Sequence, residues 1–234
     1  MPPVSSLPRS AAARPAQPPA RPVALGGLCL LGCLALGAWS GAVEPAPEWQ
    51  SLFDGRQLGQ WKPTPFGGEG EVSITDDGLL RIARGADLSG ITWEGKFPRQ
   101  DFEIALKARR VDGSDFFCGL TFPVGDDHCS LILGGWGGGV IGLSCIDGDD
   151  AANNATMQIV AFDDQRWYAV RVRVTPERIS CFLDDEQIVD LPLEGQRISV
   201  RDEVIPSQPL GIATYATTAE LRNIRWRPLP PPRP

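Results

Sequence analysis

Residues 167–190 constrain the fold of this chain more than any other segment. Within residues 170–174 valine alternates with arginine, and a period of two is typical of a strand with one buried and one solvated face. A turn containing Pro176 follows, and a second strand is predicted over residues 179–183. Two aspartates then make another tight turn before a third short strand at residues 187–189. Consecutive hairpins on one amphipathic sheet predict an antiparallel, all-β domain.

The rest of the chain repeats this pattern of short strands and turns. Further strand candidates are residues 72–75, 79–83, 90–93, 101–110, 116–122, 130–133, 140–146, 156–161, 210–215 and 220–226. Asp77-Gly78 marks a hairpin turn between the first two, and Trp61, Trp167 and Trp226 are expected in the core. No segment has a sustained apolar period of 3.6 residues, so about a dozen short strands predict a β-sandwich or jelly roll.

The first 42 residues have the pattern of a signal peptide. Three arginines precede an apolar run over residues 23–39, and small residues end the segment at Ala42. We therefore expect cleavage after Ala42 and export to the periplasm or the extracellular space. Two alternatives stay open. One is a membrane anchor, although 17 residues with four glycines are short for a span, and the other is lipidation of Cys33 in a lipobox-like LLGC sequence.

Removing this leader leaves 19 basic against 29 acidic residues, a net charge of −10. Such a balance repels nucleic acid and anionic lipid, and the basic residues show no clustered patch. The mature chain is about 190 residues long, which suits one well-buried domain. We expect no nucleic-acid partner and no membrane span, and nothing in the sequence predicts the oligomeric state.

Four cysteines follow the leader, at Cys118, Cys129, Cys145 and Cys181. An even number in an exported chain permits disulfides, with three connectivities. Three of the four lie within apolar strand patterns, which equally suits buried free thiols. No pair has CxxC spacing, so a zinc site is not expected.

A series of ordered motifs runs through most of the chain. They are SLFDG at 51–55 followed by Leu58 and Trp61, DDGLL at 76–80, DFEI at 101–104, WY at 167–168 with DDE at 184–186, and LRNI at 221–224. Together they resemble the 3-keto-disaccharide hydrolase domain family over residues 51–228, with residues 43–50 as a linker and residues 229–234 as a proline-rich tail. The resemblance implies a concanavalin-A-like jelly-roll β-sandwich of two antiparallel sheets, whose concave face binds a carbohydrate.

The resemblance also implies an activity on oxidised disaccharides or glycosides. A ketone at C3 acidifies the C2 hydrogen, so a base can remove it while the C1 substituent leaves, and water then adds back. The enolate oxygen needs a metal ion or a cluster of donors. Two segments depart from the family, because Gly113-Ser114-Asp115 replaces an NSG turn and residues 129–133 lack the polar residues of a YExQ-like strand. A non-catalytic carbohydrate-binding module or a surface interaction domain is therefore the alternative.

Three residues are candidates for the catalytic chemistry. His128 is the single histidine of the chain and follows Asp127, so the pair could supply a general base or join a cation cluster. The alternative is a polar turn between two strands. Glu103 shares one face of its predicted strand with Arg109, and both would enter the groove if that face is the concave one. On the other face they would be ordinary solvated charges.

Binding residues are expected on segments rich in glycine and aspartate. Five glycines surround Trp136 at residues 134–139, which suits a stacking platform for a sugar or a plug at one end of the sandwich. Trp93 is a second platform candidate. Asp147 and Asn153 lie in an acidic loop whose oxygens could bind sugar hydroxyls, a calcium ion or only solvent. A divalent cation such as calcium is the one cofactor that the sequence suggests.

Overall fold

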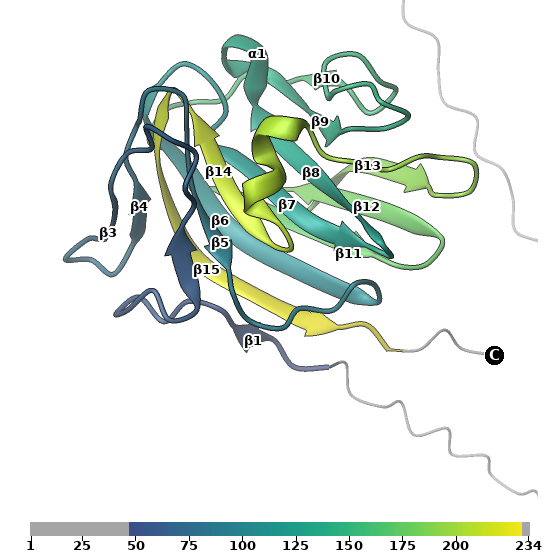
Figure 1. Ribbon diagram of the computed structural model, residues 1–234, viewed down its shortest axis with the longest axis horizontal. Helices are drawn as coiled ribbons and strands as arrows, with labels where there is room; N and C mark the ends of the chain where they lie inside the picture. Colours follow the sequence, from purple (N-terminus) through teal and green to yellow (C-terminus); the bar gives the residue numbers. More distant parts are fainter. Residues whose placement is uncertain (1–46, 231–234) are drawn as a thin grey trace, which may run out of the picture. The chain divides into compact units, whose positions relative to one another are not determined.

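Two antiparallel β-sheets pack face to face in the computed structural model, which describes residues 47–230 (Figure 1). The predicted all-β sandwich is therefore confirmed. The expected leader, the first residues of the expected linker and the last four residues lie outside the described residues. Within residues 47–230 no helix is long and apolar enough to cross a membrane.

The first sheet has eight strands in the order β13-β12-β11-β6-β15-β4-β3, with β1 paired to β15. Their bounds are β1 Gln50–Ser51, β3 Val72–Ile74, β4 Leu80–Ile82, β6 Phe102–Gly113, β11 Tyr168–Val174, β12 Arg178–Leu183, β13 Glu186–Pro192 and β15 Thr217–Pro228. The three strands predicted within residues 167–190 are β11, β12 and β13, which are neighbours in the sheet. Asp184 and Asp185 join the last two with φ of 48° and 69°, the backbone twist that a two-residue hairpin turn favours.

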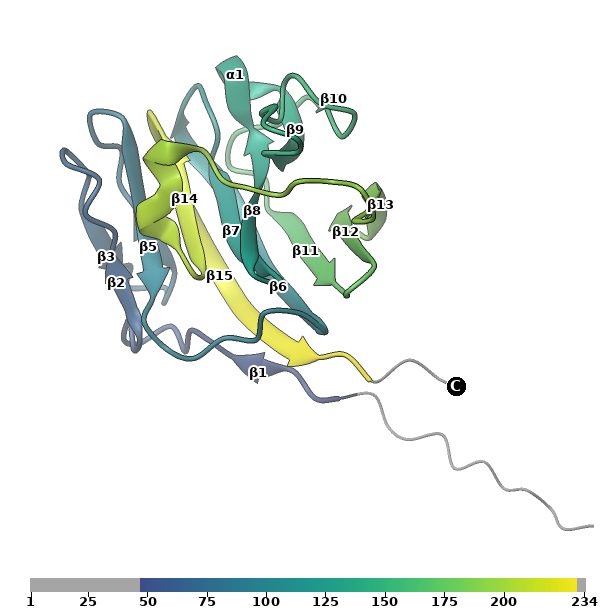
Figure 2. The same cartoon turned by 45° about the vertical axis from the view of Figure 1, so that its right-hand side comes forward.

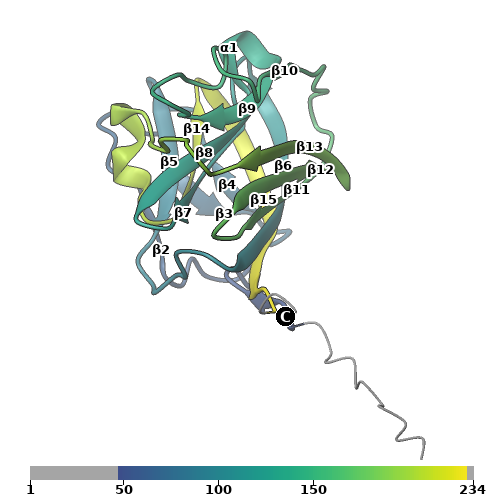
Figure 3. The same ribbon diagram turned by 90° about the vertical axis from the view of Figure 1, so that its right-hand side faces the viewer.

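The second sheet has seven strands in the order β10-β9-β8-β7-β14-β5-β2. Their bounds are β2 Trp61–Pro63, β5 Leu88–Trp93, β7 Cys118–Val124, β8 Asp127–Gly134, β9 Val140–Ser144, β10 Gln158–Ile159 and β14 Gly211–Tyr215. A short turn, α1 (Gly135–Gly138), joins β8 to β9, and a 3₁₀ helix, η1 (Asp202–Ser207), contacts β5 and β14. Figures 2 and 3 show η1 as a yellow-green coil on the side of the second sheet that faces away from the first.

The core lies between the sheets and contains the side chains that point inward from their strands. Its largest fully buried side chains include Trp61, Phe102 and Tyr168. Trp61 donates its indole N–H to the carbonyl of Leu52 at 2.9 Å and meets Trp93 edge to face, with ring centres 5.1 Å apart. The core prediction for Trp61 is confirmed. Because the alternation of β5 turns Trp93 inward, its ring is buried and does not form a platform.

Two other tryptophans differ from each other in their surroundings. Trp226 is half-buried and packs against the core. Trp167 lies on the outer face of the first sheet, where the guanidinium carbons of Arg109 and Arg222 are 4.8 and 4.1 Å from its ring centre. The prediction that Trp167 lies in the core is therefore wrong. Its ring lies on the outer face, between Arg109 of β6 and Arg222 of β15.

Cys118, Cys129, Cys145 and Cys181 are all buried free thiols, so of the two open alternatives the structure shows free thiols and no disulfide among residues 47–230. Burial raises the pKa of the Cys118 and Cys129 thiols to about 12. A buried thiol with so high a pKa is inert, which gives Cys118 and Cys129 a packing role.

Candidate active site

A groove lies on the outer face of the second sheet, the face turned away from the core, and we call it the outer groove. It is a cavity of about 290 Å³. Strands β8 and β9 form its floor, η1 and the residues before it form one wall, and residues at the ends of β5, β7, β8 and β14 form the other. Its lining side chains are Leu88, Asp115, Phe116, Ser130, Ile132, Trp136, Ser144, Arg201, Glu203, Val204 and Tyr215.

A row of hydroxyl groups crosses five strands of the sheet, four of which contribute a hydroxyl, and Ser130 and Ser144 at one end of the row line the groove. Ser144, Ser130 and Thr121 are direct cross-strand partners, and Thr121 continues through Gly211 to Thr92 on β5. Thr121 and Ser130 share a hydrogen bond of 2.8 Å between their hydroxyl oxygens. Hydroxyls that line a groove donate and accept hydrogen bonds, which matches the hydroxyl groups of a sugar.

One mouth of the outer groove is formed by Trp136. Its backbone has φ of 49° and ψ of 54°, and Gly137 follows with φ of 84°, so the turn named α1 is left-handed rather than a regular helix. Asp115 holds this turn, because its Oδ2 accepts a hydrogen bond from the Gly137 N–H at 2.8 Å while its Oδ1 accepts one from the Phe116 N–H at 2.8 Å. Trp136 is 44% exposed and does not plug the core. Its position at the groove fits the predicted platform, whose role in binding stays a prediction.

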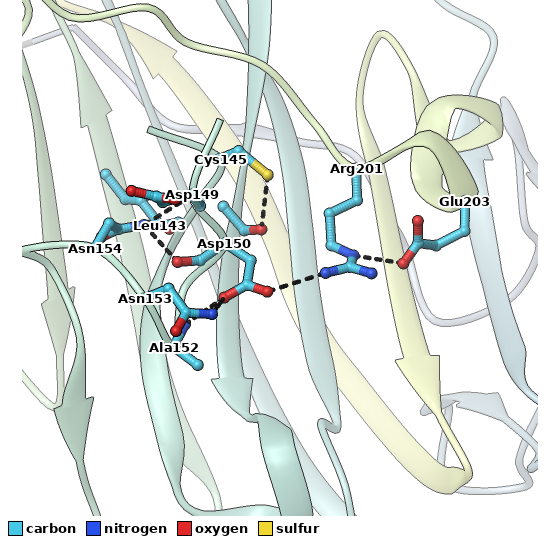
Figure 4. Close-up of polar contacts among 10 residues, drawn as sticks. Leu143, Cys145, Asp149, Asp150, Ala152, Asn153, Asn154, Arg201 and Glu203 are labelled. Atoms are coloured by element: carbon cyan, nitrogen blue, oxygen red, sulfur yellow. Dashed lines mark hydrogen bonds and ion pairs between the residues drawn. The ribbon is translucent and has the colours of Figure 1, made fainter. Parts of the chain in front are cut away.

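The opposite wall is organised around Arg201 (Figure 4). Its Nη1 lies 3.1 Å from Asp150 Oδ2, and its Nε lies 2.5 Å from Glu203 Oε1. The hydrogen bond that Arg201 donates to the Glu203 carboxylate raises the pKa of Arg201, so this side chain is a permanent cation. Asp150 is held in turn, because its Oδ1 accepts hydrogen bonds from the Ala152 N–H at 3.1 Å and from Asn153 Nδ2 at 2.7 Å.

The acidic loop after β9 supports this wall and does not itself line the groove. Asn153 supports Asp150, and Asp147 accepts the Arg197 backbone N–H at 2.9 Å. Asn154 anchors the loop, donating to the carbonyl of Leu143 at 2.8 Å. Asp147 and Asp150 thus already accept hydrogen bonds from protein donors, whereas Asn153 is itself a donor through its amide nitrogen. No group of three or more His, Cys, Asp or Glu among residues 47–230 is arranged to hold a metal ion, and the divalent cation stays a prediction.

His128 lies within β8 and not in a turn, so the alternative of a polar turn is wrong for this residue. It points to the same face as Ser130, two residues along the strand, which places it about 7 Å beyond the hydroxyl row. Its Nε2 is buried from solvent and has no hydrogen-bond partner among the described residues, and His128 is not one of the side chains that line the outer groove. Burial, together with the charge of Arg99, lowers the pKa of His128, although Asp127 opposes the shift. The imidazole is therefore neutral at pH 7 and able to accept a proton. Asp127 itself is exposed at the start of the strand.

Glu103 and Arg109 lie on β6, in the first sheet, and not at the outer groove. The Glu103 side chain is fully buried between three arginines, with Nη2 of Arg227 at 2.5 Å, Nη2 of Arg173 at 2.7 Å and Nη1 of Arg171 at 3.1 Å. Burial alone would raise its pKa, but Arg227 and Arg173 outweigh this effect and lower it. A carboxylate engaged in this way is no free base, so the structure does not bring Glu103 together with His128.

Sequence reasoning missed most of the residues that line the groove. Asp115 lies in the segment that departs from the family's NSG turn, and this departure was the sequence signal that could have pointed to it. Arg201 and Glu203 belong to a charged segment between strands, and Ser130 and Ser144 are ordinary strand residues. Their alignment in one row depends on the pairing of β8 with β9, which no local pattern reveals.

Comparison with known proteins adds two findings. The family model for the 3-keto-alpha-glucoside-1,2-lyase-like domain matches residues 48–227. No curated protein matches the chain.

Solved structures with a similar fold include several carbohydrate-related proteins. The carbohydrate-binding module CBM66 from Bacillus subtilis is 16% identical, with a TM-score of 0.50 over 72% of this chain and 95% of its own. The β-glucanase of Bacillus licheniformis is 11% identical, with a TM-score of 0.50 over 79% and 99%. A Bacillus subtilis protein with a galectin-like fold is 10% identical, with a TM-score of 0.55 over 78% and 96%. These similarities show the fold, which is the concanavalin-A-like sandwich that the sequence motifs imply.

Proposed function

Because the chain belongs to the 3-keto-alpha-glucoside-1,2-lyase-like domain family, we propose that it cleaves glycosides oxidised at C3, with the sugar bound in the outer groove. The groove itself carries this proposal. It combines an exposed tryptophan at its mouth, a floor of hydroxyls and a fixed cation on one wall. Such a set suits a ring with an apolar face, several hydroxyls and a carbonyl that becomes an oxyanion.

The reaction needs a base and a site for the developing negative charge. The base removes the proton from C2, and the electrons of the C2–H bond form a C2=C3 double bond while the C3 carbonyl becomes an enolate oxygen. The enolate then collapses, so that the C3 carbonyl is restored, the C1=C2 double bond forms and the C1–O bond breaks. The departing oxygen takes a proton. Addition of water to the double bond completes a net hydrolysis. The enolate oxygen at C3 carries the charge between these steps, so donors at that oxygen lower the barrier.

His128 is the base in this proposal. Its imidazole is neutral at pH 7, its Nε2 has no partner among the described residues, and it shares a face of β8 with Ser130. The lowered pKa favours a base that is fully deprotonated under working conditions. Asp127 and Glu103, the other two candidates, are respectively exposed at the strand start and engaged by arginines, which leaves His128 as the stronger candidate.

Arg201 and the two serines of the floor are the donors in this proposal. Arg201 has two of its nitrogens committed to Asp150 and Glu203, and its remaining N–H groups can donate to a substrate oxygen. Ser130 and Ser144 add hydroxyls at the floor. Because Asp150 and Glu203 hold the guanidinium before substrate binds, little reorganisation is needed as charge develops.

A second function has one specific observation in its favour. The floor of the outer groove contains serine and isoleucine but no carboxylate from β8, which suits a carbohydrate-binding module that has no catalysis of its own. In both cases we propose an exported protein, because the leader has the pattern of a signal peptide.

The test is an incubation of residues 43–234 with 3-keto-trehalose, with unoxidised trehalose as the matched substrate control. We expect release of a free sugar from the keto compound alone, because only a ketone at C3 acidifies C2. Release that EDTA abolishes would support the divalent cation prediction, and release that EDTA leaves unchanged would support a side-chain base alone. Saturable binding without release would favour the binding module. Neither binding nor release would contradict both functions.

A further inference from the structure

The outer face of the first sheet concentrates positive charge, although the whole chain has a net charge of −7. Alternation, together with a register shift between Arg222 and Arg225 in β15, places nine basic side chains on this face: Arg81, Lys107, Arg109, Arg171, Arg173, Arg178, Arg222, Arg225 and Arg227. The expectation that the basic residues form no clustered patch is therefore wrong. Strands β4, β6, β11, β12 and β15 each contribute cations to one surface.

Only some of these cations have an acidic partner. Two carboxylates on this face serve several arginines at once, since Glu220 binds Arg81 and Arg109 while Glu103 binds three others. Lys107, Arg222 and Arg225 make no ion pair with any residue within 47–230. The positive charge of this region is therefore far from balanced by its own acids.

Two of the unpaired cations, Lys107 and Arg225, line a depression that we call the arginine groove, together with Arg171 and Arg227, which pair with Glu103. It is a cavity of about 260 Å³ whose floor includes Ala105, Lys107 and Ala169. Strand register places Arg225 on one side of Ala105 and Arg171 on the other. Neighbouring strands are about 4.8 Å apart, so the Cα atoms of these two arginines lie about 10 Å apart with a methyl group between them. An oxyanion above Ala105 could accept N–H groups from both.

Aromatic rings hold the guanidinium groups of this groove in place. The guanidinium carbon of Arg171 lies 3.7 Å from the ring centre of Phe182, and those of Arg225 and Arg227 lie 4.7 and 4.6 Å from the ring centre of Trp49. A stacked guanidinium loses little entropy on binding. Arg171 and Arg227 already donate N–H groups to Glu103, whereas Arg225 makes no ion pair with any residue within 47–230 and can offer its in-plane N–H groups for a bidentate contact with an oxyanion.

The remaining polar residues of the groove indicate what carries the oxyanion. Asp185 and Asn223 also line it. A bare phosphate or sulfate would gain nothing from Asp185, whereas a sugar hydroxyl can donate to that carboxylate and exchange hydrogen bonds with the amide. We propose that the arginine groove binds an acidic saccharide, a sugar that carries a carboxylate or a sulfate, separately from the outer groove on the opposite sheet. This site does not depend on the proposed cleavage of keto sugars.

The proposal is tested by calorimetric titration of residues 43–234 with trigalacturonate, with a sulfated trisaccharide, with neutral maltotriose and with inorganic phosphate. We expect one or both acidic saccharides to bind, with an affinity that falls as salt rises, and the two acidic probes separate a carboxylate from a sulfate ligand. Equal binding of maltotriose, binding of phosphate as tight as that of the acidic sugars, or no binding of either acidic sugar would overturn it.

Variants locate the site. Arg225→Gln and Lys107→Gln each remove a cation that has no ion pair among the described residues, so the fold should survive, which the unfolding midpoint checks. We expect each to weaken binding of the acidic sugar at least about tenfold, the scale of one charge-assisted contact. Arg178→Gln is the matched control, because Arg178 lies on the same face but pairs with Asp190 and does not line the groove. Binding that Arg225→Gln and Lys107→Gln leave unchanged, or that Arg178→Gln weakens equally, would rule out this groove.

Discussion

The carboxylate of Asp150 lies 3.1 Å from the guanidinium of Arg201 and so joins the loop after β9 to the segment that leads into η1. The two segments are 51 residues apart in the sequence. Their contact holds Arg201 at the wall of the outer groove, where it also meets Glu203. A single ion pair therefore links the acidic loop, which lies outside the groove, to the cation inside it.

We expect Asp150→Asn to lower kcat/KM about tenfold, the effect of losing one charge-assisted hydrogen bond of about 1.4 kcal/mol. The asparagine keeps an oxygen for the Ala152 N–H and loses only the charge toward Arg201. Steady-state kinetics on a 3-keto-glycoside measure the effect. Asp190→Asn is the control, because Asp190 pairs with Arg178 on the other sheet at 3.0 Å. Equal losses in both variants would mean that the Asp150 pair has no special role.

Trp136→Ala should weaken binding of a 3-keto sugar by about 1 kcal/mol, the scale of one aromatic contact. Because the side chain is 44% exposed, the free energy of unfolding should change little. Trp136→Phe keeps an aromatic face and should retain part of the affinity. Calorimetric titration compares the three proteins, and an unchanged affinity in Trp136→Ala would make this residue structural.

His128→Gln should abolish turnover and leave binding of the keto sugar nearly intact, because glutamine can still form hydrogen bonds but cannot accept the proton. In the unmodified protein kcat/KM should rise with pH to a plateau. The midpoint should fall below about 6.5, the ordinary value for histidine, because the pKa of His128 is lowered and the neutral form is the active one. Turnover that survives in His128→Gln would remove this residue from the catalytic role.

The buried carboxylates of the first sheet should set the acid stability of the fold. Arg227 and Arg173 lower the pKa of Glu103 against its burial, and Arg81 and Arg109 do the same for Glu220. A lowered pKa stabilises the fold above the unfolded value of about 4.3, and this contribution is lost as the pH falls through the folded value. Urea unfolding should give a free energy that declines below about pH 4.3, the contribution of the two carboxylates. The lowered pKa of His128 adds a separate decline as the pH falls below about 6.5, because the unfolded state then binds a proton that the folded state does not.

The contribution of Glu103 to the stability of the fold can be tested with the variant Glu103→Gln. We expect it to lower the free energy of unfolding at pH 7 by about 3 kcal/mol, because three arginines lose their shared anion. Its acid decline should also be shallower than that of the unmodified protein. A variant with unchanged stability at pH 7 would show that the arginines are fully solvated without Glu103.

A thiol-specific colorimetric reagent should not react with folded residues 43–234. All four cysteines are buried, and burial raises the pKa of Cys118 and Cys129 to about 12, so almost no thiolate forms at pH 8. Four thiols should react after unfolding in urea without a reductant. Fewer than four would reveal a disulfide.

Much of the fold could be predicted because its signals are local. The alternation of valine with arginine predicted β11 from neighbouring residues alone, and the Asp184-Asp185 turn lies where the chain reverses between β12 and β13. The strands β1 and β2 were missed, since β1 has no buried residue and β2 is a tryptophan followed by a lysine and a proline, so neither shows an apolar alternation. Trp93 was predicted as a platform for a sugar and Trp167 as a core residue. In the structure Trp93 is buried in the core, and Trp167 lies on the outer face of the first sheet.

The sequence by itself determined the all-β class, the family and the division of each strand into two faces, because a period of two is written in adjacent residues. Only the tertiary structure decided what each face meets. The sequence presents both Glu103 and His128 as candidate catalytic residues. In the structure they lie on different sheets: Glu103 is enclosed by arginines, and His128 lies near Ser130 on β8. Pairing between strands that are distant in the chain sets these surroundings, so the groove formed by Asp115, Trp136 and Arg201 could not be read from any local pattern.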